Sequence, residues 1–534
     1  MTNGNKIDEF EEGGLDRTLS LQAGIKAYYG GDFPMAVARL RPLAEEFEDP
    51  NAQTILGMMY LKGQGVDMNE EDAFAHFQAA AAQGLAGAQY RLGLLFLKGL
   101  GTTRDAKKAL RWFHRAADQN NIHAQTSLGT CYEKGWGTRI IFLEAMKWYN
   151  AAADQGSAMA QFNVGVLYMR GHEGQQDLEA ARRSFEMAAE QGHPDAQYNL
   201  ARMFDEGHTT EQDDSMSIVW YARAAEKGHA MAQFNLGLKY FFGEGVEVDF
   251  MRARSLFNAA AEQGVPKAQY NLGLVFEFGP EVDRDFGSAA IWYRRAMDQG
   301  VTEAFYSMAR LLDAGRGVKP DPSKAAQCYL RAAAKGHADA ATRLGLMTFA
   351  GRGVKQNDRE AGRWLLQGAE RGNTEAQVNV GVMLYKGRGG KVDLVEAYLW
   401  LNLAANNGSP LAKKVVAEVL EEMTDTQIAK GKTYYNDWIE RHPLLAPPLP
   451  ETDPGEPIRG DQKPLAESVT AVPGNGEKIE GLAQPDSAEQ VAVGEGENAE
   501  TAPASEDAEI EGTSEEKNSG DPKSDPDDGG AETG

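Results

Sequence analysis

Small and apolar residues recur along this chain with a fixed period of 36 residues. An alanine returns at that spacing without an insertion, at Ala52, Ala88, Ala124, Ala160, Ala196, Ala232, Ala268, Ala304, Ala340, Ala376 and Ala412. A glycine or an alanine follows five residues later in each of the first ten copies. A period of this length is typical of stacked structural repeats, so the pattern predicts one elongated repeat domain in place of several globular domains.

Each copy predicts two helices. If the recurring alanine is position 0, the copy at Ala232 has its first helical stripe at Ala232, Leu236, Gly237 and Tyr240. Its second stripe contains Ala253, Leu256, Phe257, Ala260 and Ala261. Both follow the i, i+3, i+4 spacing of an α-helix. We name the two helices A and B. Gly243 and Gly245 separate them and Gly264 ends helix B, because glycine adopts turn conformations that other residues resist.

One such hairpin exposes both apolar stripes, so neighbouring hairpins must stack to cover them. The predicted fold is therefore all-α, a right-handed superhelical solenoid of helix-turn-helix repeats.

Three local motifs resemble those of the Sel1-like repeat, a relative of the tetratricopeptide repeat. They are the Ala-Gln-Tyr-Asn-Leu stretch at 196–200 and 268–272, the Gly-x-Gly-Val turn at 243–246, and the Trp-Tyr-x-x-Ala-Ala helix at 220–225. The resemblance covers residues 51–408 as ten copies. It implies an adaptor scaffold for protein complexes, of the kind that bacteria use in signalling, envelope regulation or host contact.

The ends of the array depart from the repeat. We expect residues 1–16 to be disordered and residues 17–50 to form a shorter tetratricopeptide-like hairpin that caps the array. Residues 409–442 should form C-terminal capping helices. There, Thr424 and Gln427 have the spacing of a capping box for the last helix.

The charge is concentrated in the last part of the chain. The net charge is −25, and residues 443–534 carry 23 acidic and 5 basic residues, so −18 belongs to this segment and −7 to the rest. This composition predicts an acidic, disordered tail. The tail either keeps the protein in solution or acts as an arm that contacts or mimics a partner. An array without a basic excess argues against nucleic acid as a partner.

Targeting signals and disulfides are not expected. No apolar run reaches the roughly 18 residues of a membrane span, and the first 20 residues are polar, so the sequence predicts a soluble, cytoplasmic protein without membrane insertion. Cys131 and Cys328 lie in the third and eighth copies. At roughly 10 Å per helical layer they would be about 50 Å apart, so we expect free thiols.

The sequence offers little catalytic chemistry, and we predict no enzymatic activity, no cofactor and no metal site. His193, His229 and His337 share position 33, where a cation favours the C-terminus of helix B. A tryptophan row at position 24 predicts core packing. It consists of Trp112, Trp148, Trp220, Trp292, Trp364 and Trp400.

A partner surface is predicted on helix A. If helix A lines the concave side of the solenoid, its position 3 faces a groove. That position holds Asn163, Asn199, Asn235, Asn271 and Asn379. An amide both donates and accepts, so such a row can bind the main chain of an extended peptide. Alternatively, each asparagine bonds a neighbouring repeat.

Three aromatic residues distinguish the sixth and seventh copies. Phe241, Phe242 and Phe278 stand at positions 9 and 10, where other copies have charged residues. Exposed aromatics on a rigid groove are typical of binding hot spots. Packing against the loop at Gly243 is the alternative.

Together these features predict a non-enzymatic bacterial scaffold that binds protein or peptide partners along its groove. One alternative is an envelope-related or β-lactamase-like member of the resembled family, although that branch has paired cysteines in each hairpin, which are missing here. Another is a signalling or localisation adaptor that is regulated by its acidic tail.

Overall fold

The computed structural model describes residues 5–171, 176–208, 212–279 and 284–443, with side chains described from Arg17 onward. Within these ranges the chain forms α-helices joined by short turns, without a strand, so the predicted all-α solenoid of helix pairs is confirmed. No helix in the described ranges is both long and apolar enough to cross a membrane.

Ten helix pairs form the repeats, and each A helix is followed by its B helix. The A helices are α3 (Pro50–Lys62), α5 (Ala86–Lys98), α7 (Ile122–Lys134), α9 (Ala158–Arg170), α11 (Pro194–Asp205), α13 (Ala230–Phe242), α15 (Pro266–Phe278), α17 (Thr302–Ala314), α19 (Ala338–Ala350) and α21 (Thr374–Lys386). The B helices are α4 (Glu70–Ala82), α6 (Ala106–Ala117), α8 (Phe142–Ala153), α10 (Leu178–Glu190), α12 (Asp214–Glu226), α14 (Phe250–Glu262), α16 (Phe286–Asp298), α18 (Pro322–Ala334), α20 (Asp358–Glu370) and α22 (Leu394–Asn406). The end helices are α1 (Asn5–Tyr29), α2 (Phe33–Glu45), α23 (Pro410–Glu422) and α24 (Asp425–Arg441).

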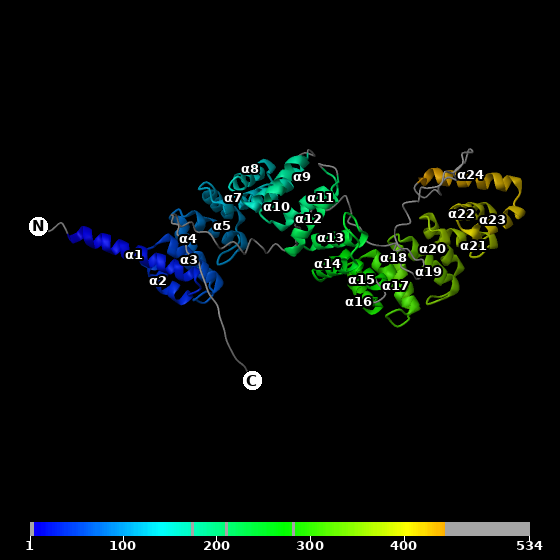
Figure 1. Ribbon diagram of the computed structural model, residues 1–534, viewed down its shortest axis with the longest axis horizontal. Helices are drawn as coiled ribbons and strands as arrows, with labels where there is room; N and C mark the ends of the chain where they lie inside the picture. The colour runs from blue at the N-terminus through cyan, green and yellow to red at the C-terminus, as the bar shows by residue number, and fades with distance from the viewer. Residues whose placement is uncertain (1–4, 172–175, 209–211, 280–283, 444–534) are drawn as a thin grey trace, which may run out of the picture. The chain divides into compact units, whose positions relative to one another are not determined.

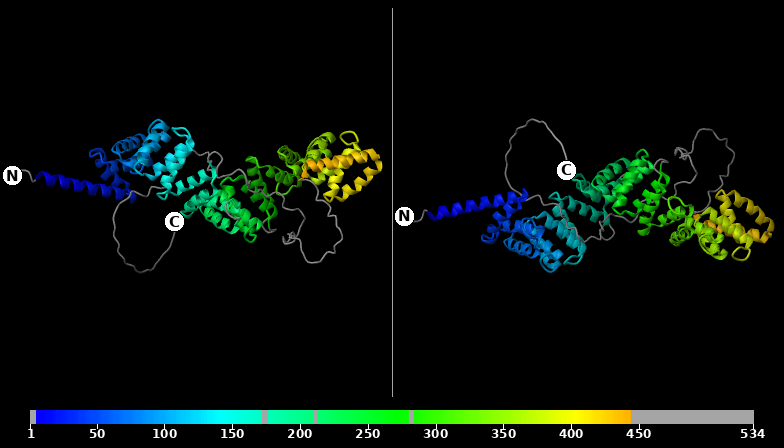
Figure 2. Two further views of the ribbon diagram at one scale, coloured as in Figure 1. Left: turned by 90° about the horizontal axis from the view of Figure 1, so that it is seen from above. Right: turned by 90° about the horizontal axis from the view of Figure 1, so that it is seen from below.

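Each helix from α1 to α22 packs on the one that follows it in the chain, and the last helix, α24, packs on α22. The labels in Figure 1 and the two further views in Figure 2 show this succession of neighbouring helices. The tryptophan row contributes to the core as predicted, since Trp220, Trp292 and Trp400 are buried.

The glycine at position 5 lets helices A and B touch. A Cβ built on Gly129 would lie 2.3 Å from the ring of Tyr149, and one on Gly93 would lie 2.5 Å from the ring of Phe113. The aromatic ring of helix B therefore occupies the space that a side chain on helix A would need. This contact explains the conserved spacing within the 36-residue unit of this chain.

The Gly-x-Gly turn connects helices A and B of one repeat and packs against the repeat before it. Its second glycine has a positive φ, and a Cβ there would strike the first turn of the preceding B helix. The distance would be 2.3 Å at Gly137, to the carbonyl of Ala106, and 2.3 Å at Gly353, to the carbonyl of Pro322. Each turn therefore lies against the repeat before it, which requires glycine at this position for two independent reasons.

A ladder of glutamines connects the repeats. The glutamine at position 1 donates to a carbonyl near the end of the preceding B helix, as Gln89 does to Ala81 at 3.3 Å. A second glutamine at position 31 donates to the first, as Gln119 does to Gln89 at 2.8 Å. The first bond recurs for Gln53, Gln125, Gln161, Gln197, Gln233, Gln269 and Gln377. Repeats 8 and 9 have Phe305 and Ala341 at this position and lack the bond.

The ends of the array differ in part from the expectation. Helix α1 begins at Asn5, so the prediction that residues 1–16 are disordered is wrong for residues 5–16. Apart from Gly13 and Gly14 this stretch has no helix breaker, and extending an existing helix is far easier than nucleating one. The capping box of Thr424 and Gln427 is confirmed at the start of α24. The proposed acidic tail lies outside the described residues, apart from Pro443.

Cys131 and Cys328 are both free thiols, as predicted. Burial raises the pKa of Cys131 to about 12, so this thiol stays protonated.

Candidate functional site

The predicted asparagine row is not an exposed surface. Asn199, Asn235 and Asn271 are 0%, 5% and 0% exposed, while Asn163 is half-buried. Asn199 donates to the carbonyl of Asp195 in its own helix at 2.8 Å. The A helices of these repeats are covered by their neighbours, so the expectation that this row faces a groove is wrong for the three buried residues.

Asn235 bonds a neighbouring repeat, which is the alternative role that we considered for this row. Its Nδ2 donates to the hydroxyl of Tyr221 in the preceding repeat at 3.1 Å. The amide therefore connects two repeats, and it is not available to a peptide.

The three predicted phenylalanines occupy different environments. Phe241 is buried and packs edge-on against Phe242 and Phe250, with ring centroids 5.4 and 5.3 Å apart. Phe242 is 38% exposed. Phe278 is half-buried beneath the guanidinium of Arg310, 5.3 Å from the ring centroid. Of the three, Phe242 retains the geometry of an exposed anchor, whereas Phe241 supports it from the core.

A hollow of about 520 Å³ lies next to this aromatic group, at the turn of repeat 6. Its apolar lining consists of Tyr240, Val246, Val248, Phe250 and Met251. Val248 and Met251 are 51% and 59% exposed, and both are apolar. The site is therefore a preformed apolar depression on a rigid support, which suits an apolar side chain from a partner.

Carboxylates border the apolar hollow. Glu247 and Asp249 belong to its lining, together with a single base, Arg252. Arg252 is already held by Asp249 at 3.4 Å. The surplus of negative charge favours basic residues in a partner beside the apolar contact.

A similar hollow of about 650 Å³ lies at repeat 4. Tyr168 and Leu178 line it at the positions that Tyr240 and Phe250 hold in repeat 6, with Phe142, Met146 and Leu167. Equivalent residues of repeats 4 and 6 thus line the two hollows, 72 residues apart in sequence.

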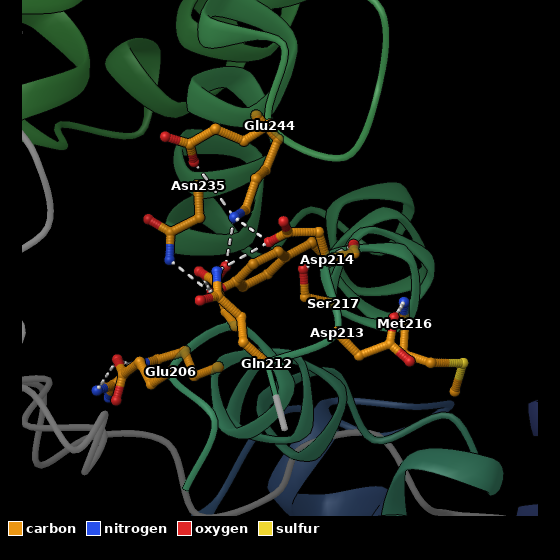
Figure 3. A network of polar contacts seen from close by, with 12 residues as sticks. Glu206, Gln212, Asp213, Asp214, Met216, Ser217, Asn235 and Glu244 are labelled. Atoms are coloured by element: carbon orange, nitrogen blue, oxygen red, sulfur yellow. Dashed lines mark hydrogen bonds and ion pairs between the residues drawn. The ribbon is translucent and has the colours of Figure 1, made fainter. Parts of the chain in front are cut away.

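Buried charges connect repeats 5 and 6. The ammonium of Lys239, whose side chain is 6% exposed, pairs with Asp214 at 2.9 Å, with Glu244 at 3.3 Å and with Asp205. Tyr221 donates its hydroxyl proton to Asp205 at 3.2 Å. Figure 3 shows Asp214, Glu244 and Asn235 converging on this cluster from α12, the turn and α13.

The electrostatics of this cluster favour a structural role. Burial lowers the pKa of Lys239, but the hydrogen bonds to Asp205 and Asp214 outweigh burial and raise it overall. Burial raises the pKa of Tyr221 well above its ordinary range. The amine is therefore always charged and the phenol always protonated, so neither acts as a base or nucleophile near neutral pH.

Equivalent clusters recur in other repeats. Glu277, whose side chain is 1% exposed, accepts from the hydroxyl of Tyr293 at 2.7 Å and pairs with Arg310 at 3.3 Å. Glu133 accepts from Tyr149 at 2.9 Å and pairs with Arg170, also at 2.9 Å. In each case the acid and tyrosine belong to one repeat and the base to the next. Within the described ranges, no group of three or more His, Cys, Asp or Glu could hold a metal ion.

The position-33 histidines have a role that the sequence analysis missed. Each caps the following A helix, because Nδ1 of His193, His229 and His337 accepts the N–H three residues later at 3.4, 3.1 and 3.3 Å. A protonated imidazole has no acceptor, so this cap requires the neutral ring. The prediction of a cation at the C-terminus of helix B is therefore wrong for these residues.

We expect this cap to weaken in acid. Burial lowers the pKa of His337, so the unfolded chain takes up a proton near its ordinary value of 6.5 before the folded chain does. The free energy of unfolding should therefore fall as the pH drops through this window. His337→Asn keeps a capping side chain and removes the titration, so its urea midpoint should change less between about pH 7.5 and about pH 5.5. His208→Asn, at an exposed site, is the control; an equal response in both variants would contradict the cap.

The described geometry is that of an α-solenoid built from identical helix pairs, and the comparisons with known proteins refine this class. The family model of the Sel1 repeat matches ten consecutive units, 50–85, 86–121, 122–157, 158–193, 194–229, 230–265, 266–301, 302–337, 338–373 and 374–409. The chain belongs to the Sel1-repeat family.

A solved structure of a Sel1-like repeat protein agrees with this assignment. The chain is similar to c5321, a protective antigen of uropathogenic Escherichia coli strains that displays the Sel1-like repeat fold, at 27% identity and a TM-score of 0.73. That match covers 87% of this chain and 100% of the antigen. A Sel1 repeat protein from Oxalobacter formigenes is 30% identical over 45% of this chain and 96% of its own, with a TM-score of 0.42. A search of curated proteins found no match.

Proposed function

We propose that this protein is a non-enzymatic scaffold that binds partner proteins on its repeat surface. The hollow of repeat 6 is its candidate docking point for an extended peptide. The observation that carries this proposal is the apolar hollow itself, whose lining residue Phe250 packs on the buried ring of Phe241. The same ring of Phe241 contacts the exposed Phe242. A surface that is already ordered loses little entropy on binding.

The chemistry of the hollow defines the ligand class. An apolar side chain fits the lining of Val248, Phe250 and Met251, and flanking lysine or arginine side chains fit the carboxylates of Glu247 and Asp249. We therefore propose a peptide with one apolar anchor between basic residues. The cytoplasmic location stays a prediction of the sequence.

The hydrolase-like alternative has less support. The branch that suggests it carries paired cysteines, whereas this chain has two cysteines in distant repeats and both are free. The buried lysine and tyrosine of repeats 5 and 6 are held in unreactive protonation states, as described above.

The test is affinity capture with the full-length protein, followed by quantitative mass spectrometry. We expect the triple variant Phe242→Ser, Val248→Ser, Met251→Ser to recover specific partners at least about tenfold less efficiently, because truncating anchor residues typically costs more than 1 kcal/mol each.

Matched substitutions control for a general effect on the surface. Met68→Ser and Val392→Ser change the residues that stand at the position of Val248 in repeats 1 and 10, where they are 69% and 57% exposed. They should leave capture unchanged. Equal capture by the triple variant, with an unchanged circular dichroism spectrum, would remove repeat 6 as the docking point.

A further inference from the structure

A row of exposed basic residues follows the turns of the last three repeats. At position 12 stand Arg316, Arg352 and Arg388, and at position 15 stand Lys319, Lys355 and Lys391, each set spaced by 36 residues. All six are exposed. We name them the basic edge of repeats 8–10.

This arrangement is particular to one end of the array. Repeat 1 has Gln64 and Asp67 at the same two positions, and repeat 6 has Glu244 and Glu247. Residues 302–409 contain 15 basic and 10 acidic residues, a net charge of +5. Residues 1–301 contain 29 basic and 40 acidic residues, a net charge of −11. The array is therefore polarised, although its total charge is close to balance.

The turns that carry the basic edge lie one behind another. A Cβ on Gly353 would meet the carbonyl of Pro322 in repeat 8 at 2.3 Å, and one on Gly389 would meet the carbonyl of Asp358 in repeat 9 at 2.7 Å. Each turn is thus fixed against the start of the previous B helix. Successive cations are therefore separated by about one layer of helices, roughly 10 Å.

The three lysines are available to a ligand. Two of the arginines are tied to the body of the repeats, since Arg352 pairs with Asp313 at 2.7 Å and Arg388 lies 4.0 Å from Asp358. No ion pair joins Lys319, Lys355 or Lys391 to any residue in the described part of the chain. Each presents an exposed ammonium that an anion can approach without breaking an existing contact.

The chain itself supplies a polyanion, and the helix that precedes it in sequence, α24, packs on the repeats that carry the basic edge. Trp438 of α24 packs against Trp400 of repeat 10, with ring centroids 6.1 Å apart. Ile439 and Phe349 pack against the same apolar cluster, and the guanidinium of Arg388 lies 5.3 Å from the ring centroid of Phe349. The last described helix therefore ends on the repeats that carry the basic edge.

The sequence after α24 contains one stretch of uniform charge. Residues 480–516 hold 12 acidic residues and no lysine or arginine. The chain between Pro443 and this stretch can span up to about 120 Å, at roughly 3.3 Å per residue. A tether of this length gives an effective concentration in the millimolar range, which an untethered acidic ligand rarely reaches.

We infer that the basic edge of repeats 8–10 binds the acidic stretch 480–516 of the same chain. This interaction is separate from the hollow of repeat 6, so either proposal can fail without the other. The uneven charge of the array favours the tail over nucleic acid as the ligand. A long nucleic acid would also meet the acidic repeats, whereas a tethered segment can bind at the positive end alone.

The test is zero-length carbodiimide coupling of the full-length protein, which joins amines to carboxylates that are already in contact. We expect links from Lys319, Lys355 and Lys391 to residues 480–516, identified by mass spectrometry. Their yield should fall several-fold between about 50 mM and about 500 mM salt, as the screening length shortens from about 14 Å to about 4 Å. Three exposed lysines near the other end of the array serve as control amines: Lys26 in α1, and Lys98 and Lys107 in repeat 2.

Two further samples decide the result. The variant with Glu506→Gln, Asp507→Asn, Glu509→Gln and Glu511→Gln should give a lower yield of cross-links at the three lysines. A mixture of isotope-labelled and unlabelled chains should give links within one chain only. Links that fall equally on the control lysines, or no links at all, would overturn the inference. Links between labelled and unlabelled chains would show that a second copy supplies the segment, which also overturns binding within one chain.

Discussion

Replacing Gly129 with alanine is expected to lower the free energy of unfolding by about 2 kcal/mol, although alanine is the better helix former by about 1 kcal/mol. The new Cβ would lie 2.3 Å from the ring of Tyr149, which is buried. That ring is also held by its hydroxyl, which contacts Thr130 at 3.0 Å and Glu133 at 2.9 Å. Helices α7 and α8 must therefore separate, and every contact between them is weakened.

The matched control is Gly87→Ala in α5. A Cβ at Gly87 meets no atom within 4 Å, so this change should be neutral or stabilising. Ala201 holds the equivalent of Gly129 in repeat 5, which shows that a repeat whose helices are spaced for a methyl group accepts it. Urea unfolding with hydrogen exchange on α7 and α8 would measure the effect. Equal midpoints for Gly129→Ala and Gly87→Ala would refute the contact argument.

Replacing Lys239 with methionine is expected to cost about 3 kcal/mol of stability. The substitution keeps most of the side-chain volume but leaves Asp205 without its cation, in a place where its side chain is 18% exposed. Removing one partner of a buried pair typically costs 3–5 kcal/mol, because the remaining charge loses its compensation.

A double-mutant cycle separates this effect from lost packing. Adding Asp205→Asn to Lys239→Met removes the orphaned charge, so the double variant should recover part of the stability that the single variant loses. Arg352→Gln serves as the exposed counterpart. Its side chain is 53% exposed, so breaking its pair with Asp313 should cost less than about 1 kcal/mol. If the double variant were as unstable as the two single changes added together, the charges would not be coupled.

The repeat architecture could be predicted because its causes are local in sequence. The spacing of Ala232, Gly237 and Phe257 defines two helical stripes, and the glycines at 243 and 245 define the turn between them. The capping box at Thr424 likewise depends on residues only three positions apart. Such local patterns can be recognised without knowing what each helix packs against.

The partner surface could not be predicted in the same way. Whether Asn235 is exposed depends on how closely the preceding repeat approaches, and its amide bonds the hydroxyl of Tyr221 in repeat 5. Neighbouring Phe241 and Phe242 have similar side chains, yet one faces the ring of Phe250 and the other faces outward. These outcomes depend on the angle between helices, which the period alone does not specify.

The hydrogen-bond ladder between repeats has a signal in the sequence, which is the recurring glutamine of position 1. A glutamine follows the alanine of position 0 in most copies, and its regularity marks the hydrogen-bond ladder between repeats. A buried amide that recurs at one position needs a recurring partner, and the glutamine at position 31 supplies it in most of these repeats.

The break in the glutamine ladder begins at Phe305 of repeat 8 and includes Ala341 of repeat 9, because neither side chain can form the bond. On its N-terminal side, seven successive repeats are joined by side-chain amides to the helix before them. On its C-terminal side stand the three repeats with the excess of positive charge. The ion pair of Arg310 with Glu277 still joins repeat 8 to repeat 7 at this break. In a linear array, where cooperativity passes from neighbour to neighbour, a junction with fewer side-chain bonds transmits less of it. The positively charged repeats should therefore be coupled less tightly to the first seven repeats than those seven are to one another.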